Sequence, residues 1–380
     1  MRVTIDQADT KGTQAKSGMA PSLMPWLDWL RFAAALLVVV AHVRARVFVE
    51  YGSLTPDSQG LVTQVAFLVT RLGHEAVLVF FVLSGFLVGG RAAERAARGE
   101  FRWLDYSLDR VSRIFVPLIP AVMFTVATMA VVSETPSIAV IAGNLLLLQG
   151  VAVTPLAANG PLWSLSYEGW FYVLCGAAMA LPTARGTIKA IAASLLTLSL
   201  IVLVTLEPVY LLCWVLGAFA YYLRAKTLSM SETVTACFII VISIAIAQLS
   251  DIAKAAAVLH LDNSSSVAAI ILAIGVGLLI RNLSAAPVAL KGLDGVGNRL
   301  ADFSYSLYLF HYPVLFLAAG LGLQRSSRID VTSLLTAGGL VVGLLAFCYV
   351  MYLLFERHTA KVRRWLRRPP RPAHSTAAPP

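Results

Sequence analysis

Long apolar runs with almost no charge constrain this chain more than any other feature of its sequence. The run 332–355 contains 24 residues and no Asp, Glu, Lys or Arg, and about 20 apolar residues are enough to cross a bilayer as a helix. Of the 380 residues, 58% are hydrophobic and 13% are charged, which is about half the charge of an average soluble domain. The chain is therefore predicted to be an all-α, polytopic membrane bundle. A soluble globule, a disordered chain and, with four cysteines, a disulfide scaffold are excluded.

Ten membrane-spanning helices are predicted from the apolar runs. They cover residues 27–48, 75–91, 114–133, 161–181, 187–206, 208–224, 232–250, 266–283, 303–323 and 332–355. The run 138–150 is too short to span comfortably and is predicted to be interfacial or re-entrant. The stretch 60–72 is predicted to be an amphipathic helix on the outer surface.

Basic residues gather on one side of the predicted spans. Ten spans place both termini on the same side, and 23 of the 30 Lys and Arg residues fall there. Because positive loops face the cytoplasm, both termini are expected to be cytoplasmic. The chain then divides into a disordered tail 1–24, a membrane domain 25–357 and a basic, Pro-rich tail 358–380, which is predicted to be a solvated anchor at the anionic inner leaflet. The net charge of +10 thus requires no nucleic-acid partner.

Ionisable side chains inside the first predicted span indicate function. Such a group costs about 2.5–3.5 kcal/mol on insertion scales. Arg31 and His42 are eleven residues apart, so they share one helix face and lie about 16 Å apart along the axis. The stripe offers a cation near the cytoplasmic surface and an imidazole deeper in the membrane. The alternatives are a snorkelling Arg31 paired with Asp28 and a His42 that only packs against another span.

Small and basic residues near the next spans suggest ligand contacts. Ser84 and Gly85 form a small pair in an aromatic stretch, which permits close approach by a ligand or, more simply, by a neighbouring helix. Arg110 and Arg113 share a helix face at the cytoplasmic edge. Two guanidiniums there suit phosphate groups, although plain positive-inside charge is the alternative.

Glu168 and His311 are the remaining polar residues deep in predicted spans. Glu168 lies about two turns from the outer end of its span and shares a face with Ser164. A buried carboxylate needs a partner, and a His or Arg of another span is expected; a packing role is the alternative. Pro313 frees the carbonyl of Leu309 and kinks the helix at His311. A place in a cavity wall and a structural hinge both stay open for His311.

The ordered set of motifs resembles the acyltransferase-3 family, which comprises bacterial integral-membrane enzymes that O-acylate sugars. The resemblance covers residues 25–357. It rests on Leu27-Asp28-Trp29-Leu30-Arg31 with His42, Phe80-Phe81-Val82-Leu83-Ser84-Gly85-Phe86, Arg110-Val111-Ser112-Arg113, Pro161-Leu162-Trp163-Ser164-Leu165-Ser166-Tyr167-Glu168, Ser304-Tyr305-Ser306-Leu307-Tyr308-Leu309-Phe310-His311-Tyr312-Pro313 and Phe355-Glu356-Arg357. Each motif alone is weak, and the series in order is specific. Trp29 is a departure, because many members have Gly there.

The resemblance implies an acyl-CoA donor, normally acetyl-CoA, that is used from the cytoplasm. It implies a sugar hydroxyl of a cell-surface polysaccharide or glycolipid as acceptor and a place in the bacterial inner membrane. Glycan export machinery is a candidate partner, and a protein that only assembles with such machinery, without catalysis, is one rival interpretation. No metal cofactor is expected, because the four cysteines fall inside predicted spans without paired spacing. The sequence adds no periplasmic catalytic domain, so a two-stage mechanism that needs one in the same chain is not expected.

The resemblance also implies roles for the site residues. Arg31 and His42 are required, Arg110 and Arg113 help to hold the donor, and the motifs extend the catalytic set to Glu168 and His311 and the donor-binding set to Ser84 and Gly85. Glu356 matches a motif but reads most simply as a helix-end charge. We expect His42, oriented by a carboxylate such as Glu168, to act as general base, with a covalent acyl-histidine as the alternative. A transporter or flippase with a proton relay is the rival function, weakened by the absence of an internal repeat.

Overall fold

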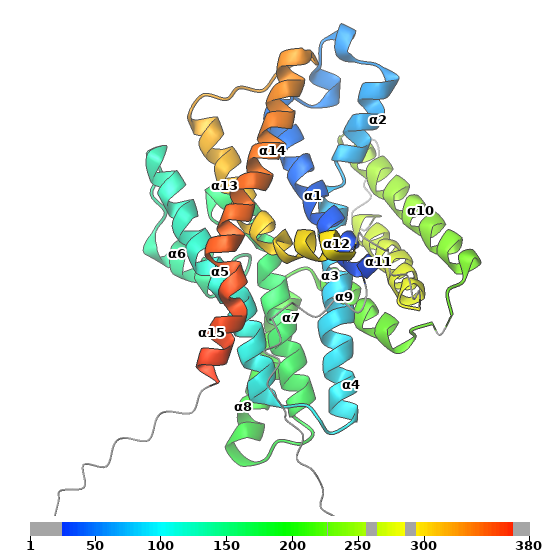
Figure 1. Cartoon of the computed structure of the whole chain (residues 1–380), viewed down its shortest axis with the longest axis vertical. Coiled ribbons are helices and arrows are strands. Elements are labelled where there is room, and N and C mark those ends of the chain that lie inside the picture. The colour runs from blue at the N-terminus through cyan, green and yellow to red at the C-terminus, as the bar shows by residue number, and fades with distance from the viewer. Residues whose placement is uncertain (1–24, 226, 256–263, 286–293, 368–380) are drawn as a thin grey trace, which may run out of the picture.

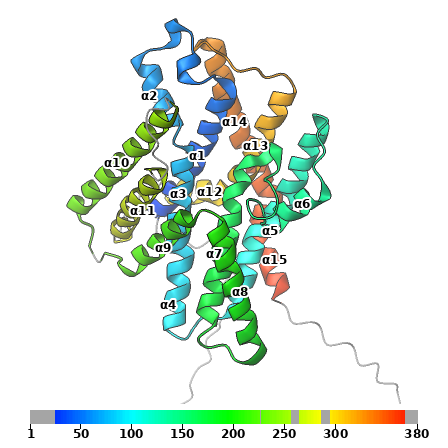
Figure 2. The same ribbon diagram turned by 180° about the vertical axis from the view of Figure 1, so that it is seen from behind.

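The computed structural model describes residues 25–225, 227–255, 264–285 and 294–367. Within these ranges the regular structure is helical, without a β-strand, and loops join the helices (Figures 1 and 2). The main helices are α1 (Pro25–Val47), α2 (Leu61–Thr70), α3 (Gly73–Ser84), a π-helix (Gly85–Gly90), α4 (Arg91–Ala97), α5 (Trp103–Val131), α6 (Ile138–Leu145), α7 (Trp163–Ala180), α8 (Gly186–Thr205), α9 (Pro208–Tyr222), α10 (Met230–Ala255), α11 (Ser264–Leu283), α12 (Asp294–Asp302), α13 (Ser304–Gly320), α14 (Val331–Leu354) and α15 (Thr359–Leu366). Short 3₁₀ turns occur at Tyr51–Ser53, Pro56–Ser58, Ala157–Leu162 and Glu356–His358. The predicted tail 1–24 lies outside the described residues.

Seven segments among the described residues are long and apolar enough to cross a membrane. They are Trp26–Val47, Leu61–Ala97, Trp103–Val131, Gly186–Thr205, Met230–Leu249, Ser265–Leu283 and Val331–Leu366. The prediction of an all-α, multi-pass membrane protein is thereby confirmed. The other three predicted spans coincide with α7, α9 and α13. Of these, α9 and α13 have 15 and 17 residues, and α7 is rich in Trp, Tyr, Ser and Gly and less apolar than the seven segments, so the count of ten stays a prediction.

The two shorter predicted segments also form helices. Residues 61–70 form α2, whose Leu61 and Val62 are 77% and 85% exposed, as an apolar face turned towards lipid would be. Residues 138–145 form α6, which has only eight residues. That is about 12 Å of helix, far less than the bilayer core, and this segment does not span alone.

Helix α1 occupies the middle of the bundle. It packs against α3, α12, α13 and α14, and Val38 and Val39 on it are fully buried. Helices α7 and α8 lie side by side in both views (Figures 1 and 2). Peripheral α10 instead exposes Phe238 and Val241. This arrangement covers one side of the helix that carries Arg31 and His42 with protein.

Trp29, the residue at which the chain departs from the familiar motif, packs against α12. A Cβ built on Gly297 of α12 would lie 2.6 Å from Nε1 of Trp29, which is closer than real side chains approach. The large indole is accommodated because the facing residue has no side chain. Gly297 thus makes room for Trp29 at the position where many family members have Gly.

Gly85 makes a close contact with another helix. A Cβ built on Gly85 would lie 1.9 Å from the carbonyl oxygen of Trp214, and one on Gly217 would lie 2.1 Å from that of Val82. The start of the π-helix and α9 therefore meet backbone to backbone, as small residues permit in membranes. Helix α9 fills the space beside Gly85, and the contact of Gly85 with the donor stays a prediction.

The helix ends gather at two ends of the bundle (Figure 1). Salt bridges join α9 to α4 through Arg224 and Glu94 at 3.3 Å, and α15 to α5 through Arg367 and Asp105 at 3.2 Å. At the opposite end, Arg46 donates to the carbonyl of Leu323 at 2.6 Å. We call the end formed by α4, α15 and the start of α5 the basal end. Its cytoplasmic orientation stays a prediction.

The carbonyl freed by Pro313 has a partner. Asn159 is fully buried, and its side-chain amide donates to the carbonyl of Leu309 at 3.0 Å and to Oγ1 of Thr125 at 3.2 Å. The predicted loss of the intrahelical bond at Pro313 is therefore met by a side chain from another element. This bond ties α13 to the loop that leads into α7.

Replacing Asn159 by Leu is expected to destabilise the protein by about 1–3 kcal/mol, because the Leu309 carbonyl is left buried without a donor. Adding Pro313→Ala supplies a backbone N–H four residues after Leu309, which can restore the helical bond. The double variant should therefore lose less than the sum of the two single losses. Thermal unfolding in detergent measures all four proteins, and strictly additive losses would contradict the assignment.

Candidate active site

An inner cavity of about 320 Å³ lies among α1, α3, α5, α7 and α13. Its polar lining consists of Arg31, Ser84, Arg91, Arg110, Arg113, Ser164, Glu168, Tyr172, Asp302, Ser304, Tyr305 and Tyr308. Five of the eight predicted site residues are in this set, namely Arg31, Ser84, Arg110, Arg113 and Glu168. The structure thus brings together side chains from four distant parts of the sequence.

A second cavity of about 480 Å³, the basal cavity, adjoins the first at the basal end. The two cavities share Leu87, Val88, Arg91 and Arg110 in their walls. Arg110 therefore lies where one cavity meets the other. A long ligand can bridge the two cavities past this guanidinium.

Glu168 is the last acceptor of a chain of hydrogen bonds. Nε1 of Trp214 donates to Oγ of Ser84 at 3.3 Å, and Ser84 donates to the Tyr172 hydroxyl at 3.3 Å. The hydroxyl of Tyr172 in turn donates to Glu168. The chain holds the Glu168 carboxylate in the cavity wall. The expectation that Glu168 orients His42 stays a prediction, and the side-chain partner that the structure gives Glu168 is Tyr172.

Arg113 is held by Glu356. Nη1 of Arg113 lies 2.7 Å from Oε1 of Glu356, whose side chain is only 1% exposed. The other carboxylate oxygen accepts from the backbone N–H and the hydroxyl of Ser306, at 2.9 and 2.6 Å. Glu356 is thus a buried anchor between α5 and α13 rather than the helix-end charge expected from the sequence. It aims the Arg113 guanidinium at the inner cavity.

His42 and His311 form a direct pair. Nδ1 of His42 lies 3.0 Å from Nε2 of His311, and Nδ1 of His311 lies 2.9 Å from the carbonyl oxygens of Leu307 and Tyr308. A carbonyl only accepts, so His311 carries its proton on Nδ1 and accepts through Nε2. His42 must then donate from Nδ1. The Nε2 atom of His42 is left as an unprotonated imidazole nitrogen.

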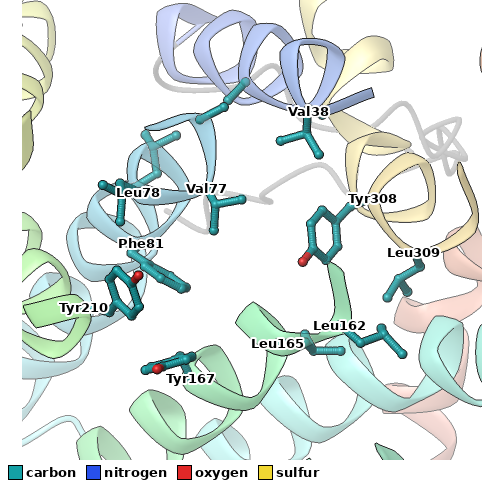
Figure 3. Packing of buried hydrophobic residues seen from close by; sticks show 14 of the residues in the cluster. Val38, Val77, Leu78, Phe81, Leu162, Leu165, Tyr167, Tyr210, Tyr308 and Leu309 are labelled. Carbon is teal, nitrogen blue, oxygen red and sulfur yellow. The ribbon is translucent and has the colours of Figure 1, made fainter. Parts of the chain in front are cut away.

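The histidine pair stands apart from the inner cavity. Neither imidazole ring is in the wall of the inner cavity. Val38 lies one turn before His42 on α1 and is buried near Val77 and Tyr308, and these two residues are in that wall (Figure 3). Tyr308 connects the two regions. The hydroxyl of Tyr308 donates to the carbonyl of Pro161 and lies 2.6 Å from Oγ of Ser164, which is in the cavity wall. The backbone carbonyl of Tyr308 accepts from Nδ1 of His311.

Several residues of the site escaped sequence reasoning. Tyr172, Tyr305 and Tyr308 read as ordinary aromatic packing, although Tyr172 follows Glu168 by four residues and Tyr305, Tyr308 and His311 are spaced by three, which places each set on one helix face. Asp302 lies just before the predicted span. Burial raises the pKa of its carboxyl, with Arg113 and Arg31 acting in the opposite direction.

Comparison with known families gives a match over most of the chain. A family model described as "Acyltransferase domain", that of the acyltransferase-3 family, matches residues 24–353. No curated protein and no solved structure gave a match. The matched range contains all eight predicted site residues and ends before α15.

Proposed function

Since the chain belongs to the acyltransferase-3 family and is a multi-pass membrane acyltransferase, we propose that it transfers an acyl group, most simply acetyl, from acyl-CoA to a sugar hydroxyl. The donor enters from the basal end, which is cytoplasmic. The acceptor belongs to a cell-surface polysaccharide or glycolipid of a bacterium, and the protein lies in the inner membrane. Glycan export machinery is the expected partner.

The two adjoining cavities support a donor of this kind. An acyl-CoA is long, with phosphates at one end and a thioester at the other. The inner cavity offers the guanidinium groups of Arg31, Arg110 and Arg113, which suit anionic oxygens. Ser84, Tyr172 and Tyr308 supply hydroxyl groups along its wall. The geometry thus suits a thioester chain that passes Arg110 and continues towards α13.

The observation that carries the chemistry is the histidine pair. His42 keeps part of its surface exposed, whereas His311 is fully buried. The imidazole that can meet a substrate is thus His42, with Nε2 free to accept a proton and Nδ1 held by His311 at 3.0 Å. His311 is a positioning residue in this reading, because it acts through His42.

The reaction follows from this arrangement. Nε2 of His42 takes the proton from the acceptor hydroxyl as its oxygen attacks the thioester carbonyl. The carbon–sulfur bond breaks, and the proton passes from His42 to the departing CoA thiolate. An acyl ester and free CoA are the products. His42 is outside the wall of the inner cavity, so we infer that the thioester must move beyond that wall, or His42 towards it, when donor and acceptor meet.

Release of free thiol tests the proposed function. Protein in lipid vesicles is given acetyl-CoA with and without a surface-glycan acceptor, and thiol and glycan acyl ester are measured together. An acyltransferase yields both in equal amounts and only with acceptor. Transport of an acyl group or glycolipid without thiol release would overturn the proposal in favour of a transporter.

Replacing Arg110 by Gln is expected to raise the KM for acyl-CoA about ten-fold or more, while the KM for the acceptor changes little. The reason is the loss of one charge-assisted contact, worth about 1.5–3 kcal/mol, where the cavities meet. Arg98→Gln is the matched control, because Arg98 is exposed, pairs with Glu94 at 3.0 Å and is in neither cavity wall. Equal donor KM values in the two variants would remove Arg110 from the donor site.

A further inference from the structure

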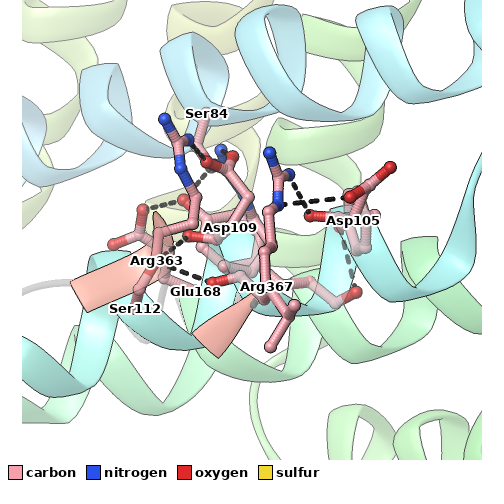
Figure 4. A network of polar contacts seen from close by, with 11 residues as sticks. Ser84, Asp105, Asp109, Ser112, Glu168, Arg363 and Arg367 are labelled. Atoms are coloured by element: carbon pink, nitrogen blue, oxygen red, sulfur yellow. Dashed lines mark hydrogen bonds and ion pairs between the residues drawn. The ribbon is translucent and has the colours of Figure 1, made fainter. Parts of the chain in front are cut away.

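The C-terminal helix α15 is fixed to α5 by ion pairs. Arg363 pairs with Asp109, and Arg367 lies 3.2 Å from Asp105 and donates to its backbone carbonyl at 3.4 Å (Figure 4). The tail expected to be a solvated anchor therefore begins with a docked helix. This helix follows residue 353, where the family match ends.

The arginines of α15 form part of the wall of the basal cavity. The charged side chains of that wall are Arg91, Arg95, Arg102, Arg110, Arg363 and Arg367, against Glu100, Asp105 and Asp109. Six guanidiniums face three carboxylates, so the cavity is strongly positive. A polyanion is the complementary ligand.

Asp109 cannot neutralise its surroundings. It pairs with both Arg110 and Arg363, so two guanidiniums share one carboxylate. Among the described residues, neither Nε of Arg110 nor Nε of Arg363 has a hydrogen-bond partner, although both atoms are buried. The side chains of Arg363 and Arg367 are 36% and 41% exposed, so their guanidinium groups keep surface in the cavity wall that anionic oxygens can reach.

Aromatic residues of the same wall favour a nucleotide. Phe101 and Tyr106 are both in the wall of the basal cavity, with ring centroids 5.4 Å apart. A purine can stack on such faces, with a gain of about 1–3 kcal/mol per base. The combination of arginines and aromatic rings matches a phosphorylated adenine nucleotide better than a simple phosphate.

We propose that α15 completes the site for the nucleotide end of the donor, with Arg363 and Arg367 binding its phosphates. This inference rests on the proposed acyl-CoA donor and adds a helix beyond the matched domain to its binding site. The donor's phosphates take up the guanidinium groups that Asp109 and Asp105 hold in place, and its thioester arm continues past Arg110 into the inner cavity.

The test compares donors that differ only at the nucleotide end. The double variant Arg363→Gln with Arg367→Gln is assayed with acetyl-CoA and with acetyl-pantetheine, which has no phosphate. The KM for acetyl-CoA is expected to rise at least ten-fold, while the KM for acetyl-pantetheine stays the same. Arg364→Gln is the matched control, because Arg364 is exposed on the same helix and is in neither cavity wall.

A second variant separates ligand binding from a merely structural latch. Asp109→Asn removes the carboxylate that holds Arg363 but makes the cavity more positive. If Arg363 binds phosphate, this variant changes the KM for acetyl-CoA and leaves the KM for acetyl-pantetheine unchanged. If the ion pair only fastens α15, Asp109→Asn raises both KM values equally, and the proposal fails.

Further outcomes separate a failure of the proposed function from a failure of the proposed role of α15. Wild-type protein that releases no thiol from acetyl-CoA overturns the proposed function itself. Thiol release that is equal in the double variant and in Arg364→Gln overturns only the role of α15. Assays in vesicles with and without anionic lipid add a last arm: a defect that appears only with anionic lipid, whichever donor is used, assigns these arginines to lipid headgroups and overturns the proposal.

Discussion

Replacing His42 by Ala is expected to lower acyl transfer by about 10²–10⁴-fold, the range supplied by general acid–base catalysis. The imidazole that pairs with His311 at 3.0 Å is then lost, and no other described side chain offers an unprotonated nitrogen at that position. Membrane insertion should be unchanged, because His42 is partly exposed and fills little of the core. Acyl ester on the glycan, measured by proton NMR in a complemented deletion strain, and thiol release by purified protein provide the readouts.

The role of His311 is separated from that of His42 by graded variants. His311→Gln keeps a side-chain oxygen that can accept from Nδ1 of His42 and should retain more activity than His311→Ala. His358→Ala is the control, because His358 lies in the turn after α14 and is in neither cavity wall. If His42→Ala keeps wild-type thiol release at equal protein levels, the base has been assigned wrongly.

Replacing Glu356 by Ala is expected to cause the largest loss of stability, about 1–3 kcal/mol for each buried donor left without an acceptor, because this carboxylate is only 1% exposed and also pairs with the 33% exposed Arg113. The variant also removes the acceptor of the backbone N–H and hydroxyl of Ser306. Glu356→Gln keeps an oxygen for Ser306 and should lose less. The free energy of unfolding in detergent, from thermal or denaturant titration, measures both.

An exposed ion pair gives the matched control for Glu356. Arg281 and Glu232 lie 3.3 Å apart with side chains 27% and 42% exposed, so Glu232→Gln should cost only about 0.2–1 kcal/mol. Removing both partners of the buried pair, as Arg113→Met with Glu356→Leu, should recover part of the loss. Equal stability of Glu356→Ala and Glu232→Gln would show that the buried pair does not anchor α5 to α13.

Local patterns in the sequence were enough for some parts of the site. The spacing of Ser164 and Glu168 placed both on one face, and both are in the inner cavity wall. Pro313 marked a carbonyl that needs a partner, and Asn159 supplies it at 3.0 Å. Arg110 and Arg113 were recognised from their spacing and both reach the cavity. Each of these inferences depends on the geometry of a single helix.

Partners from other helices could not be inferred in the same way. Glu168 was expected to hold His42, and in the structure it accepts from Tyr172. Gly85 was expected to meet a ligand, and it meets the backbone of Trp214. Glu356 and the arginines of α15 read as surface charges, yet they pair with Arg113, Asp105 and Asp109. Many combinations of polar residues satisfy the same sequence pattern.

The sequence by itself determined that this protein lies in a lipid bilayer and that its fold is all-α. Runs of about 20 apolar residues must become helices in lipid, because every backbone N–H and C=O has to be satisfied within its own segment. The ordered motifs determined the family. The tertiary structure alone decided that His42 pairs with His311, that Glu168 pairs with Tyr172, and that Arg363 and Arg367 are in the wall of the basal cavity. The physical reason is that a buried polar group must find a partner at hydrogen-bond distance, and which group lies that close depends on how helices distant in the sequence pack.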